Sequence, residues 1–587
     1  MSHVSEFQSI LEKGVEAVLP DRLVKQSLSL IPDGIQVNGT AYPVSGQLNI
    51  FGFGKAALGL VKAALKILGS RVENVVCCAP QPTEHEIKEY PDLCDVNEIL
   101  TSDGSKPNIF IFNGPRTNEP NAEVVRASLK MAKIASSMKT GDLLLVCITG
   151  GGSALLTLPA PLEKGKLALD ESVNRLSLEA IIKTTKMLSL DGASIQDLNS
   201  VRSCLDCMKA GGLACYAAPA KVVSLILSDV IGDPIQFIAS GPTYIDSEPD
   251  TEVSPYDKAL AVLKRRGLIE KVPVDVRDFL EARKGTSMRP TAVDPVPTNC
   301  LIGSLSLALE AAANEAAKLN PCCLTTNRNV LPRQIFRRTP PESFECILPI
   351  ILTDKLDNDM TQRAEAIADL SWEIRRLTLV FLARPEKTSR HVTDTMRERL
   401  VNAQTRLIGK KTYYRDLVHA CYQVAKVANE EISMNHTSSG QFLSGICLIF
   451  GGEATVKVNV KSLTSNGGRC SHAALATALR LYELQANSNS KSSPPSSPTS
   501  IQISFYARAS DGLDGPTAFG AGAWSTDELI EDSAEAGRAK QCLMACDSYG
   551  YFANGSRIDA DKGHYLPAQL TGTNVMDLFM CLIGIYA

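Results

Sequence analysis

Residues 142–154 read DLLLVCITGGGSA, an apolar run that ends at Ile148 and is followed, after Thr149, by three glycines. A continuous apolar run without alternating polar residues is typical of a strand buried on both faces of a parallel sheet. Successive glycines allow positive φ and close backbone approach, and a helix that starts after them presents free N–H groups to an anion. The stretch therefore predicts a strand–turn–helix unit in which Gly151, Gly152 and Ser153 bind an anion, with a plain tight turn as the alternative.

The same pattern extends outward through roughly the first 300 residues. Short apolar runs bounded by glycine alternate with segments of helical period, which favours a mostly parallel sheet with helices on both faces. The expected fold class is α/β, with a Rossmann-like three-layer α/β/α domain. The predicted strands are 48–51, 74–78, 109–112, 142–148 and 222–227, and the predicted helices are 56–68 and 123–138.

The chain has 587 residues, which is too long for one hydrophobic core and favours two domains. We place the boundary near Pro295, so that the domains are 1–294 and 295–587. The second domain is expected to begin with a strand at 298–303 and a helix at 305–319, and to resume strands at 445–451 and 501–507.

Two segments of the second domain have an unusual composition. Residues 327–433 are charged and poor in glycine, which predicts a helical insertion. Residues 488–500 read SNSKSSPPSSPTS, a low-complexity stretch that cannot bury a core and is expected to be a disordered surface loop.

Overall composition excludes several classes of protein. Lysine plus arginine is 60 and aspartate plus glutamate is 64, so a net charge of -4 gives no reason to expect nucleic acid or an anionic membrane as partner. No apolar run reaches the roughly 18 residues of a membrane span. The first twenty residues predict an amphipathic helix, with Phe7, Ile10, Leu11 and Val15 on one face, rather than a signal peptide. Seventeen cysteines without a secretion signal fit a reducing, cytoplasmic location.

A second glycine turn, Gly52-Phe53-Gly54-Lys55, follows the strand predicted at 48–51. Its spacing matches neither a Rossmann GxGxxG nor a Walker A motif. A lysine directly after a glycine turn at a strand end is nevertheless well placed to meet a phosphate. We therefore take Gly54 and Lys55 as candidate phosphate-binding residues, with an ordinary exposed lysine as the alternative.

An acidic loop, SDVIGDP at 228–234, follows the strand predicted at 222–227. Its two carboxylates, Asp229 and Asp233, lie four residues apart at a strand end. Carboxylates in such a place can hold Mg²⁺ or accept a proton from a substrate hydroxyl. Helix capping and turn formation are the alternative roles.

Three turns in the second half of the chain supply further candidates. DGLDG at 511–515 offers Asp511 and Asp514, and GTN at 572–574 offers Asn574. NGGR at 466–469 places Arg469 after two glycines, and a guanidinium is suited to bidentate binding of a carboxylate or phosphate. Taken singly, each could also be an ordinary surface turn.

Nine segments, taken in order, resemble the MOFRL-family glycerate kinases. The resemblance covers both ends of the chain, and its most specific blocks are the acidic loop and the DGLDG turn. The segments are FGFGKAALG (51–59), LLLVCITGGGSALL (143–156), residues 195–213 with Asn199, Arg202 and Lys209, VVSLILSDVIGDPIQFIASGPT (222–243), GGEATV (451–456), NGGR (466–469), SDGLDGPTAFGAGAW (510–524), DSY (547–549) and TGTNVMD (571–577).

The resemblance implies an enzyme that uses ATP and Mg²⁺ to phosphorylate D-glycerate, giving 2- or 3-phosphoglycerate. It also implies a smaller α/β MOFRL domain with a mixed sheet. By position, Lys55 matches the family lysine that acts on the transferred phosphoryl group, and Arg469 matches the arginine of the second domain. Asp229 and Asp233 match the acidic loop, as catalytic and metal-binding carboxylates. Because Lys55 and Arg469 fall in different domains, we expect a cleft that closes around the substrate.

The implied partners are the small molecules D-glycerate and ATP, with no nucleic acid and no membrane. The resemblance leaves open whether the protein forms a homo-oligomer.

The chain also departs from the family. Cys470-Ser471-His472 stands where the family has Asn-Gln-Glu, Cys546 stands for Asn before DSY, and Leu305 for Asn after Gly303-Ser304.

These departures leave a second hypothesis, a divergent member that binds nucleotide or hydroxy acid as a sensor or scaffold. A third, an NAD-linked oxidoreductase, is disfavoured because no GxGxxG is followed by an acid about twenty residues on.

Overall fold

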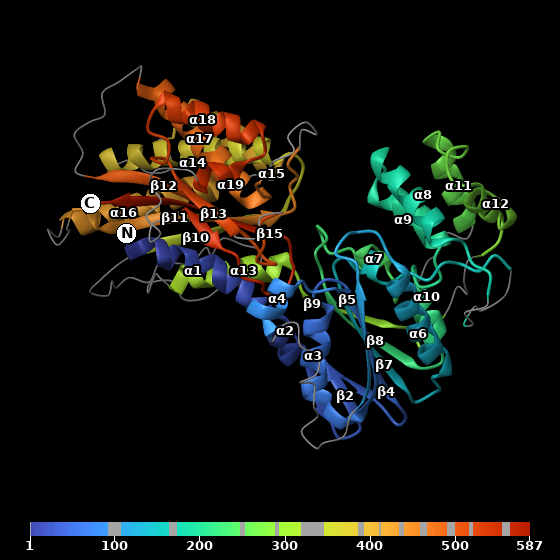
Figure 1. The fold of residues 1–587 in the computed structure, drawn as a ribbon. Helices are drawn as coiled ribbons and strands as arrows, with labels where there is room; N and C mark the ends of the chain where they lie inside the picture. Colours follow the sequence, from blue (N-terminus) through green and yellow to red (C-terminus); the bar gives the residue numbers. More distant parts are fainter. Residues whose placement is uncertain are drawn as a thin grey trace. The chain divides into compact units, whose positions relative to one another are not determined.

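The computed structural model describes residues 2–91, 107–163, 169, 173–246, 253–287, 293–318, 346–384, 392–409, 413–433, 439–457, 466–489, 499–515, 520–553 and 564–587. The chain divides into two compact units (Figure 1). We call Val18–Ser304 with Gly572–Val575 the N-terminal unit. The C-terminal unit comprises Met1–Ala17, Leu305–Thr571 and Met576–Ala587.

A six-stranded, entirely parallel sheet forms the centre of the N-terminal unit. Its order is β6-β5-β4-β7-β8-β9, which is the doubly wound order 3-2-1-4-5-6 when the strands are counted along the chain. The order reverses between β4 and β7, and ligands of such sheets bind at this switch point, outside the carboxyl ends of the strands. The strands are β4 (Leu48–Phe53), β5 (Val72–Pro80), β6 (Asn108–Gly114), β7 (Leu143–Thr149), β8 (Lys221–Leu227) and β9 (Thr298–Gly303).

Helices cover both faces of this sheet, as the continuous apolar strands predicted (Figure 1). α3 (Ala57–Leu68) lies on one face. α6 (Ala122–Ser137) and α10 (Gly212–Ala217) lie on the other, where they share a core with β4, β7 and β8. The three-layer α/β/α arrangement is therefore confirmed.

Smaller elements surround the parallel sheet. α8 (Leu178–Leu190), α9 (Ile195–Cys204), α11 (Pro255–Arg265) and α12 (Val274–Ala282) form a helical cluster with its own core. A three-stranded antiparallel sheet that was not predicted follows α2 (Pro20–Ser27). It consists of β1 (Leu28–Ile31), β2 (Gly34–Val37) and β3 (Thr40–Pro43).

The C-terminal unit is built on a mixed sheet with the order β10-β11-β15-β12-β13-β14. β10 runs parallel to β11 and the other neighbours pair antiparallel, so the predicted mixed sheet is confirmed. Phe450, Phe505 and Phe579 pack against one another at its centre. The strands are β10 (Cys346–Leu356), β11 (Phe442–Gly452), β12 (Ser500–Ala509), β13 (Gly520–Thr526), β14 (Tyr565–Pro567) and β15 (Asp577–Tyr586).

Helices flank this sheet on both faces (Figure 1). One face carries α1 (Ser2–Ala17) and α13 (Leu305–Lys318). The predicted apolar stripe of α1, formed by Phe7, Ile10, Leu11 and Val15, is buried. The remaining helices are α14 (Met360–Ala383), α15 (Asp394–Ile408), α16 (Tyr414–Ser433), α17 (Arg469–Asn489), α18 (Ser533–Met544) and α19 (Ser548–Ala553).

The division between the units differs from the expected boundary near Pro295. β9 pairs in parallel with β8 and completes the N-terminal sheet, so the division falls at Ser304 and Leu305. α1 joins the C-terminal unit because Gly14 packs against Ala308 and Leu578.

The segment expected to be a charged insertion at 327–433 is largely part of the core. Residues 319–345 lie outside the described part, but the rest supplies β10, α14, α15 and α16. These elements bury Leu370, Ile374, Leu417 and Val424 in the main core of the C-terminal unit. Charged residues on the outer faces of these elements interrupt the apolar pattern, so their buried side could not be recognised from the sequence. Of the loop expected at 488–500, Ser488 and Asn489 end α17 and Ser500 begins β12, while 490–498 lie outside the described residues.

Candidate functional site

Two loops meet at the switch point of the parallel sheet. The amide of Lys55 donates to the carbonyl of Gly150 at 2.8 Å, and the amide of Ala56 donates to Thr149 Oγ1 at 3.1 Å. Gly54 has φ +125°, and a Cβ there would overlap the Thr149 hydroxyl. The turn after β4 is thus fastened to the turn after β7, and the two candidate phosphate-binding segments form one structure.

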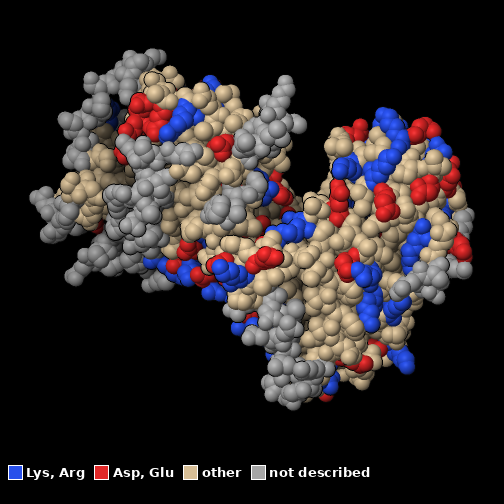
Figure 2. All heavy atoms as spheres, viewed as in Figure 1, with Lys and Arg blue, Asp and Glu red and all other residues tan. Residues whose placement is uncertain are grey.

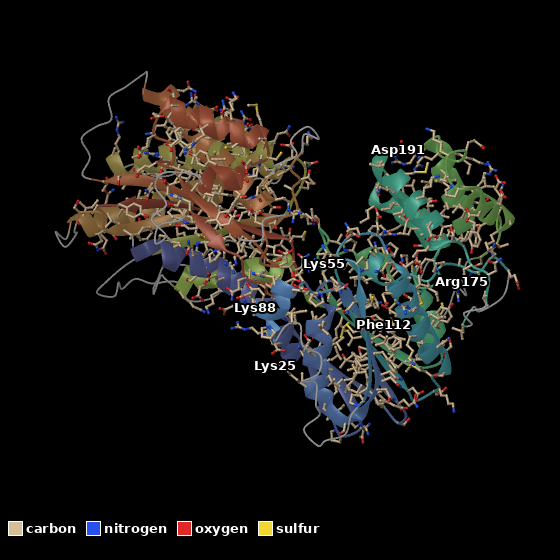
Figure 3. All side chains as sticks on the ribbon, in the orientation of Figure 1. Lys25, Lys55, Lys88, Phe112, Arg175 and Asp191 are labelled. Carbon is tan, nitrogen blue, oxygen red and sulfur yellow. The ribbon has the colours of Figure 1, made fainter. Side chains whose placement is uncertain are left out.

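The side chains of Lys55 and Asp229 flank the triple-glycine turn. Gly151 has φ +77°, and a Cβ there would lie 3.0 Å from Cγ and 3.4 Å from Cε of Lys55. A Cβ on Gly150 would overlap the carboxylate of Asp229, which follows β8. Lys55 is exposed and lies at the end of the sheet where α7 (Gly152–Leu155) begins (Figure 3). An amine and a carboxylate therefore border the same three-residue turn.

Ser153, in the first turn of α7, belongs to a hydrogen-bonded network. Its Oγ lies 2.9 Å from Oγ of Ser240. Nη2 of Arg202 donates to Ser240 Oγ at 2.8 Å and to Asn199 Oδ1 at 2.7 Å. Our site prediction missed Arg202, Asn199 and Ser240, although all three stand in blocks that carried the resemblance.

Other polar residues of this region have structural roles or extend the acidic loop. Lys209 is buried, and its Nζ donates to Asp206, the carbonyl of Leu156 and Thr157, so it fastens the loop after α7. Asp233 has φ +53° in the loop that also carries Asp229. Among the described residues no cluster of three His, Cys, Asp or Glu side chains is placed to hold a metal. Mg²⁺ often takes only one or two protein carboxylates together with substrate phosphates, and this loop offers that donor set.

Arg469, in the C-terminal unit, is held between two carboxylates. Its Nη1 lies 2.7 Å from Glu453 Oε1, and its Nε lies 2.8 Å from Asp577 Oδ2. Burial by itself lowers the pKa of Arg469, but the charges of Asp577 and Glu453 outweigh it and raise the pKa above its ordinary value. Burial raises the pKa of Asp577 to about 7, while Arg469 acts in the opposite direction. The guanidinium thus stays charged and fixed in place.

Asp514 caps the helix that begins at Arg469. Its Oδ1 accepts from the amide of Cys470 and its Oδ2 from the amide of Ser471, both at 2.8 Å. A carboxylate at a helix N-terminus satisfies free N–H groups and the helix dipole. The carboxylate of Asp514 therefore caps α17, and its predicted role in binding substrate or phosphate stays a prediction.

The departures at Cys470, Ser471 and His472 concern buried positions. Ser471 Oγ lies 2.9 Å from Ser548 Oγ, and His472 Nε2 lies 2.9 Å from Thr361 Oγ1. Leu305 and Cys546, the other departures, are also buried. These substitutions therefore change the packing around the start of α17 and α13 rather than an exposed ligand surface.

The last two candidates, Asp511 and Asn574, belong to different units of the chain. Oδ1 of Asp511 accepts from the amide of Leu513 at 3.0 Å and closes a turn in the C-terminal unit. Asn574 lies in Gly572–Val575, which belongs to the N-terminal unit, where neighbouring Thr573 donates to the carbonyl of Val18 at 2.7 Å. Both remain candidates for ligand binding.

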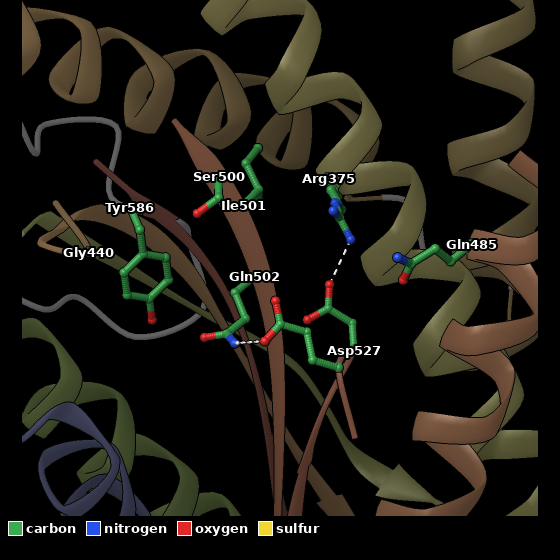
Figure 4. Close-up of a pocket in the computed structure, with 9 residues that line it drawn as sticks. Arg375, Gly440, Gln485, Ser500, Ile501, Gln502, Asp527 and Tyr586 are labelled. Atoms are coloured by element: carbon green, nitrogen blue, oxygen red, sulfur yellow. Dashed lines mark hydrogen bonds and ion pairs between the residues drawn. The ribbon is translucent and has the colours of Figure 1, made fainter. Parts of the chain in front are cut away.

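A pocket in the C-terminal unit lies away from Arg469. Its lining includes Arg375, which is paired with Asp527 at 2.7 Å, and Gln502 and Tyr586 (Figure 4). Tyr586 ends β15, whereas Asp577, the partner of Arg469, begins it. The pocket therefore lies at the opposite end of β15 from Arg469.

Acidic and basic side chains are interspersed on the visible faces of both units (Figure 2). None of the described helices combines the length and apolarity that a membrane crossing requires.

Comparisons with known proteins agree with this architecture. The model of a domain of unknown function, DUF4147, matches residues 6–281, and that of the MOFRL family matches 446–577. Glycerate kinase of Danio rerio is 29% identical over 583 residues, which cover 98% of this chain and 97% of that protein. Glycerate kinase of Macaca fascicularis is 30% identical over 476 residues, covering 81% of this chain and 97% of the relative. A crystal structure of glycerate kinase from Thermotoga maritima has the same fold, with a TM-score of 0.61 and 22% identity over 99% of this chain and all of that one.

The doubly wound parallel sheet defines an α/β protein of the class in which ligands bind at the switch point, where the glycine turn and Lys55 lie. The mixed-sheet unit is the part matched by the MOFRL model. The chain belongs to the glycerate kinase family that combines a DUF4147 and a MOFRL domain.

Proposed function

We propose that this protein is a glycerate kinase that transfers the γ-phosphoryl group of ATP to D-glycerate, giving phosphoglycerate and ADP. The observation that carries the proposal is the placement of Lys55 and Asp229 on the two sides of the triple-glycine turn. Family membership supports the reaction, since relatives that align over nearly the whole chain are glycerate kinases.

The turn at 150–152 and the start of α7 suit the polyphosphate, because glycines let the backbone approach it closely. Phosphoryl transfer depends mainly on positioning and on neutralising charge. In our proposal a hydroxyl oxygen of glycerate attacks the γ-phosphorus while the bond from that phosphorus to the β–γ bridging oxygen breaks. Lys55 neutralises the transferred group, and Asp229 orients the hydroxyl and accepts its proton.

Asp229 and Asp233 are the residues that would hold Mg²⁺, consistent with two carboxylates on one short loop at the end of β8. When bound with ATP, this ion supplies charge neutralisation for the phosphate oxygens. Arg469 is proposed to add positive charge from the C-terminal unit, since Glu453 and Asp577 keep its guanidinium ionised.

Coupled measurement of ADP release with D-glycerate tests this function directly. We expect turnover that requires ATP, D-glycerate and Mg²⁺, and NMR of the product distinguishes 2- from 3-phosphoglycerate. Binding of ATP and D-glycerate without ADP release would overturn the kinase and favour a sensor or scaffold. The burial of Cys470, Ser471 and His472 supports the kinase over that alternative, because these substitutions do not lie on an exposed surface. Reduction of hydroxypyruvate by NADH would instead indicate the oxidoreductase.

We further propose a cytoplasmic location. The described cysteines, among them Cys77, Cys147, Cys447 and Cys581, are free thiols, and most are buried. Free buried cysteines are typical of a reducing compartment. Fractionation of cells that express the tagged full chain would test the location.

A further inference from the structure

Arg202 and its partners form a second polar group beside the glycine turn. Arg202 and Asn199 are one turn apart on α9 and are joined by a hydrogen bond of 2.7 Å. Both bind Ser240, whose hydroxyl donates to Asn199 Oδ1 at 3.1 Å. Through Ser240 the group reaches Ser153 in the first turn of α7. The Arg202 guanidinium therefore lies two hydrogen bonds from the triple-glycine turn.

The backbone holds this group in a strained conformation. Ala239 and Ser240 have φ of +50° and +62°, values that residues with a side chain rarely adopt. The amide of Ala210 donates to the carbonyl of Ser240 at 2.8 Å, and the amide of Ser240 donates to Phe237. Strain that the surrounding structure maintains in this way concentrates at functional sites.

Arg202 makes no ion pair within the described part of the chain. The charge of Asp206, just beyond α9, raises the pKa of Arg202, but this carboxylate is bound by Lys209 at 2.6 Å. Its Nε is buried without a hydrogen-bond partner among the described residues, and so is Nδ2 of Asn199. Burial lowers the pKa of Arg202 to about 10, so the guanidinium is still charged at neutral pH. A half-buried cation that makes no ion pair among the described residues and has a buried, unused donor is costly unless an anion completes it.

We propose that Arg202, with Asn199 and Ser240, is the site that recognises the carboxylate of the hydroxy-acid substrate. The inference rests on the proposed function and identifies the part of it that selects a hydroxy acid over a simple alcohol. A planar guanidinium fork with neighbouring amide and hydroxyl groups matches a planar carboxylate. Ser153 then stands between two anion sites, with the glycine turn and Lys55 serving the phosphate and Arg202 serving the carboxylate.

Steady-state kinetics of the full-length protein test this role. Arg202→Lys keeps the charge but loses the fork, and Arg202→Gln loses both. We expect the KM for D-glycerate to rise about 10- to 100-fold in Arg202→Gln, the scale of a charge-assisted hydrogen bond, and less in Arg202→Lys. The KM for ATP should change less than about 3-fold, well below the effect of one such bond. The preference for D-glycerate over glycerol, which lacks the carboxylate, should fall by the same factor as the KM rises.

Asn199→Asp is a sharper variant, because it places a carboxylate where Oδ1 already accepts from Arg202. The new charge neutralises Arg202 within the protein and repels a substrate carboxylate, so D-glycerate binding should weaken while the fold stays intact. Arg265→Gln is the matched control. It breaks an ion pair to Asp197 on the same helix α9 without touching the network, and it should leave both KM values unchanged.

Three results would overturn the carboxylate site. They are a rise in the KM for ATP instead of glycerate, a fall in kcat with both KM values unchanged, or no effect of any Arg202 variant. If the unaltered protein shows no turnover, the proposed function fails by itself. Calorimetric titration with D-glycerate and with glycerol, on the unaltered protein and Arg202→Gln, then still decides whether Arg202 binds a carboxylate.

Discussion

The carboxylate of Asp229 fills the space beside Gly150 that any side chain at position 150 would need. This contact joins the loop after β8 to the turn after β7, two adjacent strands of the parallel sheet. Glycine is therefore required at position 150 by the packing of the acidic loop, and not only by the approach of a phosphate to the turn.

Gly150→Ala should therefore impair catalysis by moving Asp229. We expect kcat/KM for the kinase reaction to fall at least about 100-fold, the scale of losing one positioned catalytic group. Gly537→Ala is the control, because open space surrounds Gly537 in α18, and the better helix former should be neutral or slightly stabilising. Normal turnover of Gly150→Ala would show that the position of Asp229 does not matter.

Lys55→Ala should reduce kcat without reducing stability. Lys55 is exposed, so its removal leaves no cavity and no buried partner. Loss of a positive charge at the transferred phosphoryl group predicts a fall in kcat of about 100- to 1,000-fold. Lys66→Ala, which removes an exposed lysine on α3 and its surface pair with Asp21, should behave like the unaltered protein in both turnover and thermal unfolding. Near-normal turnover of Lys55→Ala would remove the phosphoryl role.

Arg469→Ala should destabilise the C-terminal unit, because Asp577 is buried and loses its main counter-charge. We expect a loss of about 3 kcal/mol in the free energy of unfolding, measured by urea denaturation. The double variant Arg469→Ala/Asp577→Asn should recover part of that loss, since no uncompensated charge remains. Lys318→Ala, which breaks an exposed pair with Glu315, should cost less than about 0.5 kcal/mol. Strict additivity of the two changes would contradict the coupling.

His472 should make stability depend on pH. Burial lowers its pKa to about 4, whereas a free imidazole titrates near 6.5. The unfolded chain thus binds more protons between these values. The contribution of His472 is complete above about pH 6.5 and is lost as the pH falls toward 4.

His472→Asn removes this titration. The change in the free energy of unfolding between about pH 6.5 and 4 should become smaller by up to about 3 kcal/mol, since each pKa unit corresponds to about 1.4 kcal/mol. The slopes against pH are compared rather than the absolute values, because the substitution also alters the hydrogen bond to Thr361. An unchanged slope would indicate that the pKa of His472 is the same in the folded and unfolded protein.

The sequence predicted the parallel sheet and the convergence of its turns, because a strand buried on both faces is a continuous apolar run. β7 and the Gly151 turn are local features of this kind. Ser153, by contrast, pairs with Ser240 at a separation of 87 residues, and nothing local indicates that partner. The cap of α17 by Asp514, 44 residues away, was hidden for the same reason. α14 looked like an insertion because exposed charged residues, such as Arg376 paired with Glu373, interrupt its apolar pattern, whereas Ile374 is buried.

The order of the chain through the two units has a consequence for folding. α1 packs through Gly14 against Leu578 in β15, which is distant from it in sequence. The N-terminal unit in turn includes Gly572–Val575, which is separated in sequence from the rest of that unit. Neither unit is a contiguous piece of the chain, so neither can be completed until all of its segments are present, and a break near residue 295 would leave each fragment without a segment that the other carries.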